Sequence, residues 1–303
     1  MADVSLGRAL GSGFALIKRR PASVLVWGLL HVIFVQAPIL ALLAYGAGDL
    51  VAAFGHAGTL SEPQAADFAF GLQRRMMLGE AAVLPGMLVH AIVSAAVYRA
   101  VLEPKGRAFA YLRLGRQEAW LLLLALTFSV LVGFAILPLE GLVAVTVISL
   151  MKLQAPAALA GPAVAVLALA VILWAFARLS MAGPMTFSDR RFRLFESWSL
   201  TRRNGLALLG LALLLILVMV LIELVVVGVA AGAVIGLGAG HAVDPRAVLA
   251  WLESPRLLDP VAAASLAALA LVAAAIVGAL NAIAVAPWAT AYGQLKDRPN
   301  AWA

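Results

Sequence analysis

The sequence predicts an all-α integral membrane protein with six transmembrane helices, and three observations support this fold class. Hydrophobic residues make up 64% of the 303 residues and charged residues only 12%, whereas soluble domains carry about 25% charged residues. Mean hydropathy is +1.03. Six apolar stretches reach or approach the ~20 residues that a helix needs to cross a bilayer. No polar block is long enough to form a soluble domain, so we expect residues 1–303 to form a single helical bundle.

The six predicted spans are approximately residues 23–45, 77–98, 119–138, 157–177, 206–230 and 261–287. The first is longer than the ~7–15 apolar residues of a cleaved signal, so we expect it to be retained. The third is predicted to break at Pro138, because proline interrupts helices, and to leave a short re-entrant or interfacial piece, Leu142–Met151. The apolar run Leu206–Gly240 would form ~52 Å of helix against a ~30 Å hydrocarbon core, so it must tilt, break or project. The last span is predicted to end near Pro287.

Two segments outside the spans are predicted to be amphipathic. Residues 4–17 place apolar side chains on one side of a helical wheel and polar ones on another, namely Leu6, Leu10, Phe14 and Ile17 against Arg8, Ser12 and Arg19. This pattern is typical of a helix that lies in the membrane interface. Residues 176–205 (FARLSMAGPMTFSDRRFRLFESWSLTRRNG) predict a helix that leaves the membrane, a turn, an interfacial helix and a helix that returns.

A weak threefold repeat relates these pieces. Spans 2, 4 and 6 end as VYRAVLEP, FARLSMAGP and AYGQLKDRP, each with a proline where a helix would stop. Spans 1, 3 and 5 follow GFALIKRRP, FAYLRLGRQE and FESWSLTRRNG. We therefore expect three helical hairpins, each entered through an amphipathic interfacial helix and a basic corner. The alternative is that any helical hairpin with basic cytoplasmic loops gives this pattern.

Lysine and arginine divide unevenly between the two sides of this arrangement. Five of the 22 fall on one side, namely Arg74, Arg75, Lys152, Arg246 and Arg256. The other 17 fall on the side that holds both termini. Basic residues collect in cytoplasmic loops, so both termini are predicted to be cytoplasmic. The alanine- and arginine-rich composition indicates a bacterial protein, and hence the inner (cytoplasmic) membrane.

The pattern around Arg178, Pro184, Glu196-Ser197-Trp198 and Thr201-Arg202-Arg203 resembles a broad set of six-helix bacterial membrane proteins. That set includes the membrane domain of some glycerophosphodiester phosphodiesterases and its uncharacterised free-standing relatives. The resemblance covers most of the chain in layout but only about 30 residues in pattern, and it implies the six-helix fold. Phosphodiesterase activity would need a separate soluble barrel with metal-binding carboxylates, which this chain lacks, so that activity is not implied.

Polar residues within the spans form two candidate groups. Counting ~1.5 Å per residue from the cytoplasmic corners places five side chains near the midplane, namely His31, His90, Asn281, Thr127 and Ser129. Such residues are candidates for lining a substrate or proton path. Alternatively, they form hydrogen bonds between helices that stabilise the bundle. The second group, Glu80, Glu140 and Glu223, lies ~26–33 Å from those corners, near the outer boundary of the membrane. These carboxylates are candidate functional residues, or they form ion pairs or extend to water without a functional role.

A ridge of glycines follows one helix face in span 5. Gly228, Gly232, Gly236 and Gly240 recur every four residues, a spacing that lets helices approach closely. The ridge could pack within the chain or against a second copy in a homo-oligomer. Five other spans are available to receive it, so packing within the chain is favoured.

The leading functional hypothesis is a non-enzymatic inner-membrane protein that interacts with lipid or organises the envelope. Its basic collar suits anionic head groups and consists of Lys18, Arg19, Arg20, Arg190, Arg191, Phe192, Arg193, Phe195, Trp198, Arg202 and Arg203. The net charge of +7 is explained by topology and lipid, so nucleic acid is not predicted as a partner. The alternative is a small-solute or lipid transporter or channel that uses the midplane residues, and a third hypothesis is a membrane-embedded lipid enzyme.

Familiar catalytic and metal-binding signatures are absent from the sequence. Cysteine does not occur, which excludes disulfides, cysteine nucleophiles and cysteine-ligated zinc. The sequence contains no P-loop, HExxH or GxSxG pattern and no carboxylates at metal-ligand spacing. No catalytic residue, metal or cofactor is therefore predicted.

Overall fold

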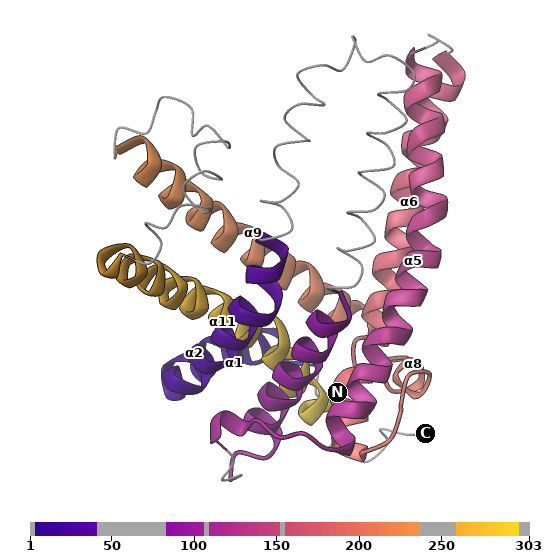
Figure 1. Cartoon of the computed structure of the whole chain (residues 1–303). Helices are drawn as coiled ribbons and strands as arrows, with labels where there is room; N and C mark the ends of the chain where they lie inside the picture. The colour runs from indigo at the N-terminus through magenta and orange to yellow at the C-terminus, as the bar shows by residue number, and fades with distance from the viewer. Residues whose placement is uncertain (1–3, 41–82, 106–108, 152–154, 237–258, 297–303) are drawn as a thin grey trace. The chain divides into compact units, whose positions relative to one another are not determined.

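The computed structural model describes residues 4–40, 83–105, 109–151, 155–236 and 259–296 (Figure 1). Every regular element in these residues is helical, and six helices are long and apolar enough to cross a membrane. They are Pro21–Leu40, Val83–Leu102, Phe109–Ala135, Val166–Asp189, Gly205–Val229 and Ala263–Lys296. The predicted all-α class and the count of six candidate spans are thus confirmed.

The chain forms two compact units. Unit 1 comprises Met1–Leu16, Ser94–Ile216 and Ile283–Ala303, and unit 2 comprises Ile17–Val93 and Leu217–Ala282. The labelled elements, in chain order, are α1 (Leu6–Arg19), α2 (Pro21–His31), the π-helix η1 (Val32–Gln36), the 3-10 helix η2 (Phe109–Tyr111), α5 (Arg116–Met151), α6 (Ala155–Leu179), α7 (Ala182–Asp189), α8 (Glu196–Leu200), α9 (Gly205–Gly236) and α11 (Pro260–Lys296).

In unit 1 the longest helical pair is formed by α5 and α6, which run side by side (Figure 1). The rings of Phe128 and Phe176 stack across this pair with 6.3 Å between their centroids. The predicted break in span 3 is wrong, because α5 continues as one helix of 36 residues through Pro138. At ~1.5 Å per residue it measures ~54 Å. Proline removes one backbone hydrogen bond, but the turns on either side keep theirs, and apolar helices tolerate this loss.

The two other long helices are also continuous. α9 holds 32 residues without interruption, so the apolar run of span 5 does not break before Gly236. α11 has 37 residues and passes through Pro287 to Lys296, which corrects the predicted end of span 6. Pro287 is buried, and the ordered turns on both sides of it hold the helix together.

The N-terminal helix forms as predicted but buries a different face. α1 buries Ala9, Gly13 and Leu16, whereas Phe14 from the predicted apolar stripe stays 46% exposed. Small side chains allow closer helix contact than large ones, so the Ala9–Gly13 stripe takes the packed side. The side chains of the predicted stripe, Leu6, Leu10, Phe14 and Ile17, are therefore left partly or fully exposed.

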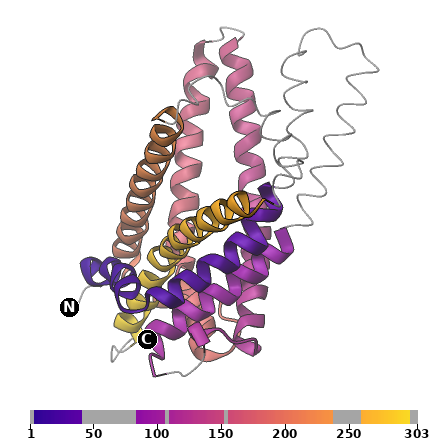
Figure 2. The ribbon, with the colours of Figure 1, turned by 60° about the vertical axis from the view of Figure 1, so that its left-hand side comes forward.

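Unit 2 is organised by a close backbone contact between α2 and α11 (Figure 2). A Cβ atom built on Gly28 would clash with the carbonyl group of Ala274, and one built on Gly278 would clash with that of Val24. The contact therefore requires glycine on both helices. The ridge predicted on span 5 behaves differently, because a Cβ on Gly228 or Gly232 meets no described atom within 4 Å.

Packing of this ridge against another helix is not seen among the described residues, so its packing within the chain or against a second copy stays a prediction. Within the described residues, the close helix contact uses Gly28 and Gly278, and Gly228 and Gly232 face open space. Gly236 is the last residue of α9, and Gly240 lies outside the described residues. The spacing of small residues shows where a helix could be approached, but the fold selects which ridge is used.

This contact predicts different effects for the same substitution at two glycines. Gly278→Ala should lower the free energy of unfolding by about 1–3 kcal/mol, because the added methyl group overpacks a backbone contact. Gly228→Ala is the matched control and should be neutral or stabilising, since alanine favours the helix by about 1 kcal/mol. Midpoints of thermal unfolding in detergent would test this. Equal midpoints for the two variants would show that the contact does not matter.

Candidate functional site

A buried ion pair organises one end of unit 1. The guanidinium of Arg99, near the end of the helix Val83–Leu102, pairs with the carboxylate of Glu118 in the first turn of α5. The two side chains are only 2% and 4% exposed. A charge this deeply buried is tolerated only with an opposite charge and further hydrogen bonds. The pair therefore fixes the end of one apolar helix to the start of the next.

Arg99 also holds the loop between these helices and α7. Its guanidinium donates to the carbonyl oxygen of Tyr111 and lies over the ring of Phe187, 5.3 Å from the ring centroid. Gln117 Nε2 donates to the Phe187 carbonyl oxygen at 3.0 Å. Ala110 and Tyr111 take positive φ angles of 46° and 60°, which bend this loop sharply. One arginine thus connects four segments that lie apart in the sequence.

A second arginine plays a comparable role at the corner between α6 and α9. Arg178 is 4% exposed and donates from Nη2 to the carbonyl oxygen of Trp198 at 2.8 Å. Its guanidinium lies 4.9 Å from the ring centroid of Trp198 and 5.8 Å from that of Trp174. The hydroxyls of Ser197 and Thr201 lie 2.8 and 3.0 Å from the Arg178 carbonyl oxygen. Both the side chain and the backbone carbonyl group of Arg178 therefore hold this corner in place.

The third helix end makes a similar contact. Near the end of α11, Gln294 Oε1 accepts a hydrogen bond from the backbone N–H of Ser5 at 2.8 Å, just before α1. Arg99, Arg178 and Gln294 stand five, six and five residues before the prolines of the three repeated segments. Each side chain bonds the backbone of an amphipathic or corner segment. The segment that Arg99 contacts is the short 3-10 helix η2 rather than an α-helix, and the threefold repeat stays a prediction.

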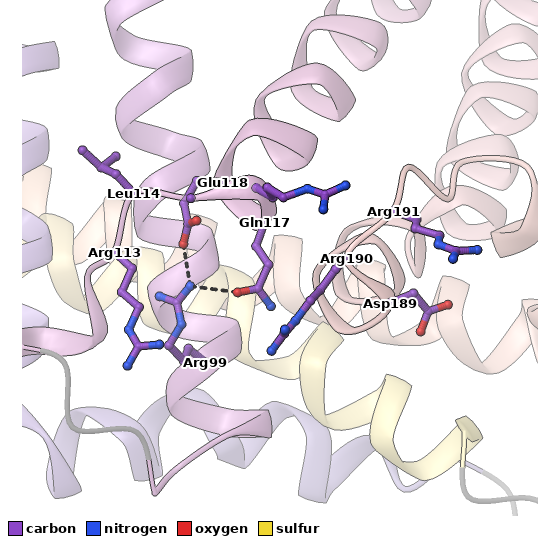
Figure 3. A pocket seen from close by; sticks show the side chains of 10 residues that line it. Arg99, Arg113, Leu114, Gln117, Glu118, Asp189, Arg190 and Arg191 are labelled. Atoms are coloured by element: carbon purple, nitrogen blue, oxygen red, sulfur yellow. Dashed lines mark hydrogen bonds and ion pairs between the residues drawn. The ribbon is translucent and has the colours of Figure 1, made fainter.

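A pocket of about 510 Å³ opens beside the Arg99–Glu118 pair (Figure 3). Its charged lining comprises Arg99, Arg113, Arg116, Glu118, Asp189, Arg190 and Arg191. Glu118 forms an ion pair with Arg99. Asp189 lies 3.3 Å from the guanidinium of Arg193, a residue that does not line the pocket. Among the described residues, Arg113, Arg116, Arg190 and Arg191 have no carboxylate partner. We call this hollow the arginine pocket.

Arg190 reaches the arginine pocket from an unusual backbone position. It follows the last residue of α7 with φ of 55° and ψ of 31°, the left-handed region that glycine favours. Any other residue there costs roughly 1–2 kcal/mol. The side chain points toward Gln117 and Arg99, whereas Arg191 and Asp189 lie at the far side (Figure 3).

The collar residues predicted between 190 and 203 lie around the corner of α7, α8 and α9. Arg193 is half-buried and pairs with Asp189 and Glu196, and Phe192 is also half-buried. The remaining members, Arg190, Arg191, Phe195, Trp198, Arg202 and Arg203, are exposed. Lys18, Arg19 and Arg20 are exposed as well but belong to unit 2.

The predicted midplane residues divide between the units. In unit 2 the rings of His31 and His90 lie edge to face with centroids 6.4 Å apart, and His31 Nδ1 lies 3.3 Å from the Trp27 carbonyl oxygen. Asn281 donates to the Val277 carbonyl oxygen of its own helix, as Thr127 does to that of Leu123 in unit 1. Ser129 is exposed. The two histidines are thus brought together, while Asn281 and Thr127 bond to their own helices.

The three outer carboxylates form no cluster in the described residues. Glu223 is exposed on α9, Glu140 lies on α5, and Glu80 falls outside the described residues. No group of three or more histidine or carboxylate side chains in the described part of the chain is arranged to hold a metal ion.

The Arg99–Glu118 pair was not predicted from the sequence, although the sequence contains a signal for it. Glu118 stands beside an apolar span in a segment whose other charges, from Lys105 to Arg116, are basic. An isolated carboxylate next to an apolar helix needs a cationic partner, and Arg99 is the arginine nearest the end of the preceding span.

Comparison of the chain with models of known protein families, with curated proteins and with solved structures gives no match. The resemblance to the six-helix bacterial membrane proteins therefore stays a prediction.

The buried pair predicts a large loss of stability when one partner is removed. Glu118→Ala should lower the free energy of unfolding by about 3–5 kcal/mol, because it leaves a buried guanidinium without its counter-charge. The double variant Arg99→Met/Glu118→Leu should recover much of that loss, since methionine can also pack against Phe187. Asp189→Asn, at a half-exposed pair, should cost less than about 1 kcal/mol. Thermal unfolding in detergent measures all three, and an undiminished midpoint for Glu118→Ala would contradict the role of the pair.

Proposed function

We propose that this chain is a non-enzymatic, multi-pass inner-membrane protein that binds anionic lipid through its basic collar. The observation that carries the proposal is the mixture of exposed arginine and exposed apolar side chains at the corner of α8 and α9. Arg202 and Arg203 are exposed, and Phe195 and Leu206 are each 77% exposed. Apolar side chains of this kind enter the membrane interface, while the guanidinium groups reach the head groups. Each basic residue near an anionic surface contributes about 1 kcal/mol.

The proposal includes an orientation in the membrane. The six apolar helices form three hairpins, with α1, α7 and α8 in the cytoplasmic interface and both termini in the cytoplasm. Support comes from the uneven distribution of lysine and arginine and from the exposed apolar side chains along α9, such as Leu217, Leu221 and Leu224. Such a surface is stable when lipid covers it.

The transporter hypothesis has one supporting observation, the edge-to-face contact of His31 and His90. Asn281 and Thr127 donate hydrogen bonds to carbonyl oxygens of their own helices, so these bonds are local and do not join the two residues to a shared polar path. The basic collar has more exposed, chemically matched residues behind it, so lipid binding is the better-supported function. The transporter and lipid-enzyme hypotheses stay predictions.

Lipid binding by the collar predicts enrichment of anionic lipid around the protein. Protein extracted with its native lipid should carry more anionic lipid than the bulk membrane, measured by native mass spectrometry and lipidomics. Arg202→Gln/Arg203→Gln should reduce that enrichment severalfold, because two charges near the surface are lost. Arg8→Gln/Lys105→Gln is the control, since it removes two exposed charges outside the collar. Equal lipid content in wild type and bulk membrane would reject the proposal.

The orientation predicts the behaviour of reporter fusions. A reporter active only in the periplasm should be silent when fused after Ala303, because the C-terminus is placed in the cytoplasm. The same reporter fused after Gly48, following the first predicted span, should be active. The reverse pattern would place the basic collar on the periplasmic side and contradict the proposed orientation.

A further inference from the structure

We propose that the arginine pocket binds the phosphate group of a phosphate ester, as a defined site within the lipid-binding face. This inference rests on the proposed function in that it names the ligand chemistry of one part of that face. It requires more than a charged surface, because a pocket must hold one ligand in one place. The lining residues of the pocket meet this requirement in four respects.

The first respect is charge. Five arginines and two carboxylates line the arginine pocket, and Arg99 and Arg193 pair with those carboxylates. Arg113, Arg116, Arg190 and Arg191 then surround the hollow without a carboxylate partner among the described residues. Like charges gathered in this way repel one another, and an anion in the hollow would remove that repulsion.

The second respect is the type of cation. All the basic side chains of the pocket are arginines. The planar guanidinium group presents paired N–H donors that match two phosphate oxygens, whereas the ammonium group of lysine acts as a point charge. Arg116 is the first residue of α5, Arg113 lies in the segment between η2 and α5, and Arg190 approaches from the end of α7. A phosphate between them would accept hydrogen bonds from separate directions.

The third respect is preorganisation. The buried Arg99–Glu118 pair and the Gln117–Phe187 hydrogen bond fix the start of α5 against α7. Arg190 is held in the left-handed region at the end of α7, and its side chain points toward Gln117 (Figure 3). The frame of the pocket is therefore set before a ligand arrives, which lowers the entropy cost of binding.

The fourth respect is the size of the pocket and the apolar residue at its rim. The volume of about 510 Å³ lies within the ~300–1,000 Å³ of typical small-ligand sites and is much larger than one phosphate group. Space is left for the organic part of an ester. Leu114, which is 80% exposed, lines the pocket and gives it an apolar edge. A phosphate ester with an apolar portion suits this combination.

Two sources could supply this phosphate group, namely a lipid head group and a soluble phosphate ester. The test therefore uses two probes on the full chain. Phosphatidic acid is added to phosphatidylcholine nanodiscs, and retained lipid is counted by native mass spectrometry. Inorganic phosphate is added to protein in uncharged detergent at constant ionic strength, and the midpoint of thermal unfolding is followed.

The wild type should retain one phosphatidic acid that resists removal, and Arg113→Gln/Arg116→Gln should weaken this retention about tenfold or more. Arg8→Gln/Lys105→Gln removes the same charge outside the pocket and should change retention less than twofold. If inorganic phosphate also raises the wild-type midpoint and fails to do so in Arg113→Gln/Arg116→Gln, the phosphate group alone suffices for binding. A response to phosphatidic acid only would assign the site to a lipid head group. Both results support the pocket.

A second variant separates binding from stability. Arg190→Gly removes a pocket arginine and places glycine where the backbone favours it, so the unfolding midpoint without ligand should be unchanged or raised. Phosphatidic acid retention should nevertheless fall. Unchanged retention in both this variant and Arg113→Gln/Arg116→Gln would overturn the pocket proposal. Loss of general anionic lipid enrichment on Arg202→Gln/Arg203→Gln would still support the collar, so the two proposals can fail independently.

Discussion

The buried pairing of Arg99 with Glu118 is the interaction on which the arginine-rich end of unit 1 depends. Two charges are removed from water there, and their mutual attraction, the bond to Tyr111 and the contact with the Phe187 ring offset that cost. Loss of one partner strongly destabilises the fold, because it leaves the other charge buried without a counter-charge. The pair also positions the neighbouring segments. The start of α5, η2 and α7 are held together by this one guanidinium, and the remaining arginines of the pocket are carried on those segments.

A comparable contact is found at two other helix ends of unit 1. Arg178 donates to the carbonyl oxygen of Trp198 and lies 4.9 and 5.8 Å from the centroids of two indole rings. Gln294 accepts a hydrogen bond from the backbone of Ser5. Long apolar helices give little directional information at their ends, since their side chains pack equally well in several registers. A polar side chain that must satisfy its hydrogen bonds restricts the register and connects each helix to a corner. In unit 1 the last of these contacts joins the end of the chain to its beginning.

Backbone proximity in unit 2 illustrates how packing selects among equivalent patterns. α9 carries glycines at the spacing that favours close contact, yet the described contact is made by Gly28 and Gly278. Ala274, Gly278 and Ala282 form an equally regular stripe on α11, and α2 supplies a facing glycine. A small-residue stripe is useful only where another backbone can reach it. α5 likewise continues through Pro138, because one missing hydrogen bond does not end a helix whose neighbouring turns are intact. A local sequence pattern alone therefore does not decide where this helix ends.

The sequence by itself determined the all-helical class, the six apolar spans and the basic corners, because hydrophobic length and charge distribution are local properties of the chain. It also identified residues 190–203 as chemically unusual. The tertiary structure decided which polar groups meet. It paired Arg99 with Glu118 across 19 positions, brought His31 to His90, and gathered Arg113, Arg116 and Arg190 around one hollow. Such pairings depend on how helix ends are placed in space. The position of Glu118 indicates a need for a cationic partner, but local hydrophobicity and charge do not specify the other contacts.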